Sequence, residues 1–176
     1  MSKPKDEMDI LREVGTTAAA HGTIALSEIL GRKIKLRLPC IEIMACDKLT
    51  KTMHADGMVV TLQTQILSGL DGKVIFFLEE ESAFKLVDSC YKTKEDSKKL
   101  GLFTEIGMSV IKEIGNIIIA SYISSLGFFT KRLIIPSFPM LINAPFAEVV
   151  NMLAIGYGKE DYVLVVETLL EDEKDN

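Results

Sequence analysis

The chain has 176 residues, of which 48% are hydrophobic and 26% are charged, so it can bury a core and remain soluble. This composition excludes a wholly disordered chain, and three cysteines, an odd number, argue against a miniprotein stapled by disulfides. The net charge of −5 argues against a general nucleic-acid binder, which needs excess lysine and arginine to displace counterions from phosphates.

The first half of the chain predicts a helix, three strands and a second helix. Apolar residues recur at helical spacing from about Asp9 to Leu30, and Gly31 marks the stop. Residues 34–43 are extended, and Pro39, which lacks an amide donor, is expected at a strand edge or bulge. A hairpin and an amphipathic helix follow, at residues 58–67, 73–78 and 79–91.

The second half predicts the same order without the final helix. A long helical pattern covers residues 105–126, and residues 133–142 are extended and carry Pro139. A last pair of neighbouring strands is expected at 149–157 and 162–169.

The two halves resemble each other. Adding 100 to the residue number superposes six identical residues of the first half on the second: Glu13, Gly15, Ala20, Leu26, Ile34 and Pro39. This period is too long for a solenoid, whose repeats span roughly 20 to 50 residues. We therefore expect one domain over residues 1–176 with duplicated units at about 9–91 and 105–170. The predicted fold is mixed α/β (α+β) with a pseudo-two-fold axis, in which long helices pack on antiparallel sheet.

The second long helix carries a polar stripe. Ser109, Glu113 and Asn116 recur at i, i+4 and i+7, which places them within an arc of roughly 60°. Glu105 and Lys112 border the same stripe.

Any amphipathic helix has a polar face, so the stripe by itself is an ordinary feature. Gly115 and Asn116 are poor helix formers, however, and both stand in mid-helix. Their position favours a close approach to a neighbouring element and a specific polar contact.

The spacing Ser109-x3-Glu113-x2-Asn116-x22-Pro139 resembles the signature of the CheC, CheX and FliY family of chemotaxis phosphatases. The resemblance implies hydrolysis of the aspartyl phosphate of the response regulator CheY, in the cytoplasm. A protein catalyses phosphoryl transfer mainly by positioning the reactants and stabilising the charge of the transition state, and a carboxamide can orient an attacking water. By this resemblance Asn116 orients the water and Glu113 pairs with a lysine of the regulator. The partner-binding residues it implies are Ser109, Lys112 and Pro139.

The first half repeats the spacing as Asp9-x3-Glu13-x2-Thr16-x22-Pro39. Two copies resemble the CheC branch, whereas the CheX branch carries one. Thr16 stands where the family places asparagine, and a threonine hydroxyl does not reach as far as a carboxamide. We therefore expect this second site to be degenerate, and inactive or very weak, although Glu13 can still dock a partner.

The resemblance also bears on cofactors and partners. CheY supplies both the phosphoryl group and its Mg²⁺, so no metal or cofactor of the chain's own is implied. A second implied partner is the receptor deamidase CheD. The competing hypothesis is an adaptor without catalysis that binds CheY-phosphate or CheD.

No other motif points to a chemistry. His21 and His54 lie in different elements without a neighbouring acid or nucleophile, and the cysteines lack the CxxC spacing of a zinc site. No phosphate-binding glycine loop is present. The apolar stretch 127–146 favours core strand over a partner-binding surface. No run approaches the roughly 20 apolar residues that span a bilayer, and the N-terminus is too polar for a signal peptide.

Overall fold

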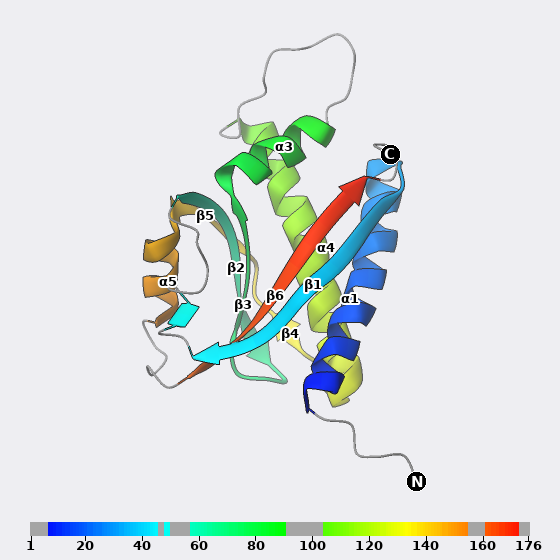
Figure 1. Ribbon diagram of the computed structural model, residues 1–176, viewed down its shortest axis with the longest axis vertical. Coiled ribbons are helices and arrows are strands. Elements are labelled where there is room, and N and C mark those ends of the chain that lie inside the picture. The colour runs from blue at the N-terminus through cyan, green and yellow to red at the C-terminus, as the bar shows by residue number, and fades with distance from the viewer. Residues whose placement is uncertain (1–6, 46–47, 50–56, 91–103, 155–160, 173–176) are drawn as a thin grey trace.

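Two long helices lie side by side and cover one side of the strands in the computed structural model of the chain (Figure 1). The structure describes residues 7–45, 48–49, 57–90, 104–154 and 161–172. Its helices are α1 (Glu7–Leu30), α3 (Glu80–Cys90), α4 (Glu105–Thr130) and α5 (Phe146–Ala154). Its strands are β1 (Ile34–Ala45), β2 (Met58–Ser68), β3 (Lys73–Glu79), β4 (Ile135–Pro136), β5 (Met140–Pro145) and β6 (Tyr162–Asp172).

The ends of the two long helices follow local signals. Gly31 has φ +60° and ends α1, as predicted, because glycine adopts the left-handed conformation without steric cost. Thr104 caps α4 by accepting a hydrogen bond from the Gly107 amide at 3.1 Å. The helix then continues to Thr130, four residues beyond the predicted end, and is capped by Lys131 at φ 54°.

The strands form two antiparallel sheets. The first joins β1 to β6, and the second has β2 at its centre with β3 on one side and β4 and β5 on the other. The β2–β3 hairpin is confirmed. The register of β1 against β6 shifts between Arg37 and Cys40, so the interruption falls at Pro39, as predicted.

The strand pairings of the two sheets correspond to each other when the halves are superposed by residue number. Met140 of β5 pairs with Gln63 of β2, and Cys40 of β1 pairs with Glu167 of β6. Moving 100 residues along the chain leads from Cys40 to Met140, and moving 104 residues leads from Gln63 to Glu167. Each sheet thus pairs a strand of the first half with a strand of the second half, and the paired positions correspond between the two sheets. The pseudo-two-fold mixed α/β fold predicted from the sequence is confirmed.

The predicted strand at 149–157 is wrong. Residues 146–154 form α5, and residues 155–157 lie outside the described part of the chain. Phe146, Val149 and Val150 are buried against Val59 and Ala144, and their spacing is helical. The two β-branched valines suggested a strand, but burial on one side of a helix decided the structure. The partner of β6 is consequently the distant β1, not the preceding segment.

The prediction of a core strand over 127–146 is also wrong in part. Only β5 and the two residues of β4 are extended there, and five large apolar side chains of the stretch are exposed. They are Phe128, Leu133, Ile135, Phe138 and Met140.

By length and composition alone, α4 could cross a membrane, with a mean hydropathy of 1.4 over its most apolar window. The expectation that no run approaches such a length is therefore wrong for this helix. In the structure 44% of that window is buried, and Ile114 and Ile118 pack against Leu26 of α1 and Leu36 of β1. This is the environment of a helix in a protein core.

Candidate functional site

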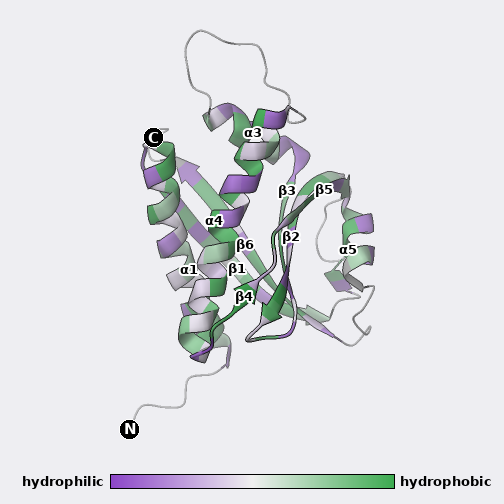
Figure 2. Cartoon of the chain, turned by 180° about the vertical axis from the view of Figure 1, so that it is seen from behind, coloured by the Kyte–Doolittle hydropathy of each residue, from purple (hydrophilic) through white to green (hydrophobic). Residues whose placement is uncertain are grey.

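The polar stripe of α4 reaches solvent. Ser109, Lys112 and Glu113 are exposed and Asn116 is half-buried, while Gly115 of the same turns faces the core. Figure 2 shows the corresponding hydrophilic turns in the part of α4 that lies nearer α3. One helix therefore presents a carboxylate and, one turn later, a carboxamide to an approaching molecule.

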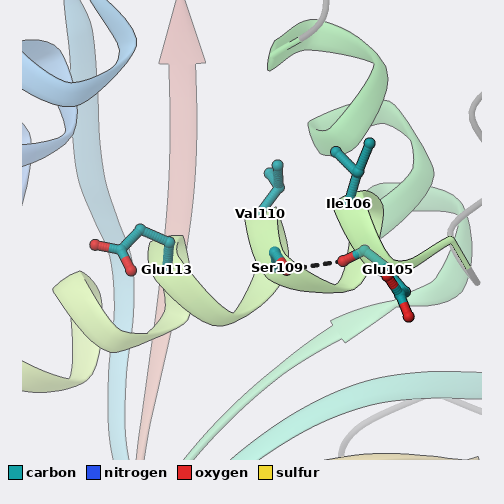
Figure 3. Close-up of a pocket in the computed structure, with 5 residues that line it drawn as sticks. All are labelled: Glu105, Ile106, Ser109, Val110 and Glu113. Carbon is teal, nitrogen blue, oxygen red and sulfur yellow. Dashed lines mark hydrogen bonds between the residues drawn. The ribbon is translucent and has the colours of Figure 1, made fainter.

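A shallow depression opens on the N-terminal half of α4 (Figure 3). It is lined by Glu105, Ile106, Ser109, Val110 and Glu113. The Ser109 hydroxyl donates a hydrogen bond to the Glu105 carbonyl oxygen at 2.8 Å, which holds that side chain against the helix. Asn116, Lys112 and Pro139 do not line the depression, so the structure brings together only part of the predicted site there.

The sequence reading missed Ile106 and Val110 as lining residues. Ile106 is 53% exposed, and Val110 is half-buried and also packs in the core. Their positions in the sequence could have indicated this role, because each immediately follows a residue of the polar stripe or of its border.

Asn116 lies on a part of α4 that packs closely against the sheet. A Cβ atom added to the adjacent Gly115 would lie 2.9 Å from Leu62 Cδ2 and 3.0 Å from Phe76 Cδ1, so α4 packs closely on β2 and β3. Among the described residues, no hydrogen-bond partner of the Asn116 side chain is found. Its donor and acceptor are thus available to other molecules.

Pro139 lies within residues 134–141, a segment that runs along one flank of α4. The segment is bounded by Ile134 and Leu141, which pack with Ile119 and Ile123 of α4. Asn116 precedes these two isoleucines by three and seven residues and therefore lies on their side of the helix.

The corresponding stripe on α1 is exposed as well but is occupied by its own contacts. Asp9, Glu13 and Thr16 are all exposed. An Arg12 guanidinium nitrogen lies 3.6 Å from a carboxylate oxygen of Asp9, and the Thr16 hydroxyl donates to the Arg12 carbonyl oxygen at 2.8 Å. This hydroxyl is directed at its own helix backbone, which is a different arrangement from that of Asn116.

Comparison with known proteins supports the family resemblance. No protein-family model matches the chain. The CheY-P phosphatase CheC of Bacillus subtilis (strain 168) is 27% identical over 172 residues, which cover 96% of this chain and 82% of that protein. The chain is therefore similar to CheC over nearly its whole length.

Solved structures show the same fold. The crystal structure of Thermotoga maritima FliY matches with a TM-score of 0.77 and 24% identity, covering 98% of this chain and 86% of that one. A FliG–FliM complex from H. pylori contains a chain that matches with a TM-score of 0.68 and 13% identity, covering 96% of this chain and 87% of that one. At these identities the likeness shows the architecture alone.

Proposed function

We propose that this chain is a phosphatase that hydrolyses the aspartyl phosphate of the response regulator CheY. In this mechanism Asn116 orients the attacking water in line with the bond to be broken, and Glu113 aligns the regulator by pairing with a lysine of its active site. The observation that carries the proposal is the placement of these two side chains one turn apart on the surface of a closely packed helix. The curated relative named a CheY-P phosphatase supports the choice of substrate.

The chemistry suits a carboxamide. Its oxygen can accept a hydrogen bond from the water while its amide donates elsewhere, so the water is held in one orientation. Positioning of this kind supplies much of the catalysis of phosphoryl transfer. The regulator brings its own Mg²⁺, which neutralises charge on the phosphoryl oxygens when bound.

The candidate residues extend along α4 beyond the depression, because Asn116 lies one turn past Glu113, and this favours a broad docking surface over a small-molecule pocket. Ser109, Lys112 and Glu113 offer a hydroxyl, a cation and an anion over about one helical turn. A protein substrate can contact all three while its acyl phosphate reaches Asn116.

The test measures phosphate release from purified CheY phosphorylated with acetyl phosphate. The wild-type chain is expected to accelerate release, and Asn116→Ala to return it to the intrinsic rate while CheY still binds. Asn151→Ala is the matched control, because Asn151 is exposed on α5 and is expected to act like the wild type. Unchanged acceleration by Asn116→Ala would show the catalytic assignment to be wrong. Binding of CheY without acceleration by the wild type would favour the adaptor, which sequesters CheY-phosphate or CheD.

A further inference from the structure

Phe138 is the most exposed large apolar side chain among the described residues, at 98%. It stands between β4 and β5, in the stretch that the sequence assigned to the core. A phenylalanine held in water forgoes the favourable free energy of burying its ring. The ring packs on none of the core clusters formed by the described residues, so their packing does not require an aromatic side chain at this position.

The backbone that carries Phe138 is fixed. The Ser137 amide donates to the Gln65 carbonyl oxygen at 2.7 Å, and the Gln65 amide donates to the Ser137 hydroxyl oxygen at 3.0 Å. The buried Thr64 hydroxyl donates to the Ser137 carbonyl oxygen at 2.7 Å. Pro139 restricts the backbone on the other side. The ring is therefore presented by an ordered segment, which lowers the entropic cost of binding it.

This segment lies beside the proposed catalytic surface. It is bounded by Ile134 and Leu141, which pack on the flank of α4 that also carries Asn116. The segment that carries the ring therefore lies along the same flank of α4 as the carboxamide.

The duplication provides an internal comparison. The residue that corresponds to Phe138 in the first half is Leu38, before Pro39. Leu38 is half-buried and packs against the core, and a Cβ added to Gly15 would lie 3.0 Å from its Cδ1. The half that has lost its asparagine therefore also lacks an outward apolar side chain. The two features occur together on the second half alone.

We propose that Phe138 is a docking residue that inserts against an apolar surface of CheY beside its phosphorylated aspartate and selects the second half as the working site. This proposal builds on the proposed function, since it names a further contact of the same substrate. Aromatic side chains that become buried when two proteins bind are enriched among the residues that carry the binding energy. In this proposal Phe138 acts outside the reaction centre, so its contribution is to binding.

The experiment compares Phe138→Ser with Phe128→Ser. Phe128 is 76% exposed near the C-terminus of α4, three turns beyond Asn116, and serves as the matched control. Phe138→Ser is expected to raise the KM for phosphorylated CheY about tenfold and to leave kcat unchanged, because it removes binding common to ground and transition states. Phe128→Ser is expected to leave both constants unchanged. Thermal unfolding of both variants should match the wild type.

A second measurement separates this proposal from the phosphatase assignment. Binding of Mg²⁺- and beryllofluoride-loaded CheY requires no turnover, and Phe138→Ser should weaken it about tenfold even if the wild type proves inactive. Wild-type affinity in Phe138→Ser, or equal losses in both variants, would overturn the proposal. So would a change in the sedimenting mass of the chain alone with CheY affinity intact, because the ring would then serve a second copy of the chain.

Discussion

Gly15 and Gly115 occupy corresponding places at which α1 and α4 approach the strands. A Cβ added to Gly15 would lie 2.8 Å from Ile41 Cδ1, and one added to Gly115 would lie 2.9 Å from Leu62 Cδ2. The surroundings differ, because Leu62 is fully buried whereas Ile41 is half-exposed. Packing therefore constrains the glycine at position 115 more tightly than the glycine at position 15.

Gly115→Ala should destabilise the protein more than Gly15→Ala. Overpacking a filled core costs about 1 to 3 kcal/mol, and the gain in helix propensity returns up to about 1 kcal/mol. We expect a net loss of about 1 kcal/mol in the free energy of unfolding for Gly115→Ala. Ile41 can turn aside for Gly15→Ala, which should be close to neutral. Urea unfolding measures both, and equal losses would contradict the difference in packing.

Thr16→Asn should not restore phosphatase activity to the Asn116→Ala variant. The first half also differs at Leu38, which packs inward, and at Asp9, which pairs with Arg12. A carboxamide introduced at position 16 would therefore lie on a surface that lacks the other contacts proposed for CheY. Phosphate release from phosphorylated CheY is the measurement. Recovery of acceleration in the double variant would show that the first half needs only its asparagine.

Ser137→Ala should lower the free energy of unfolding by about 1 to 2 kcal/mol. The change removes the oxygen that accepts from the Gln65 amide and leaves that part-buried donor without its partner. It should also weaken CheY binding, because Phe138 would be presented less rigidly. Ser124→Ala, at an exposed position of α4, is the control. A variant as stable as the wild type would mean that water replaces the lost acceptor.

The stability of the protein should fall at alkaline pH in part because of Tyr122. Burial raises the pKa of this phenol above its ordinary value of 10.0, and a hydrogen bond with Thr168 at 3.4 Å lowers it by less. The folded state therefore favours the neutral phenol. This contribution to stability is complete below pH 10 and is lost as the pH rises from 10 through the folded-state pKa.

Tyr122→Phe should consequently flatten the decline of the free energy of unfolding above pH 10. Tyr162→Phe is the control, because Tyr162 is 77% exposed and lies outside the core. Urea unfolding at a series of alkaline pH values measures both. A decline of the same steepness in Tyr122→Phe would assign the alkaline loss to other groups.

Local patterns determined much of the fold. Helical spacing located α1, α3 and α4, the loss of an amide donor placed the interruption of β1 at Pro39, and the polar turn placed the β2–β3 hairpin. The stripe of Ser109, Glu113 and Asn116 was predictable too, because a helix fixes the angle between its residues without reference to any other element.

The tertiary structure alone decided three features that depend on distant partners. The valines of α5 became helical because one face packs on β2 and β5, and β6 paired with a strand more than a hundred residues earlier in the chain. Phe138 stayed in water because none of the described helices and strands covers the segment that Ser137 ties to β2. Periodicity describes which residues share a face, but burial depends on what lies opposite that face, and only the folded chain supplies it.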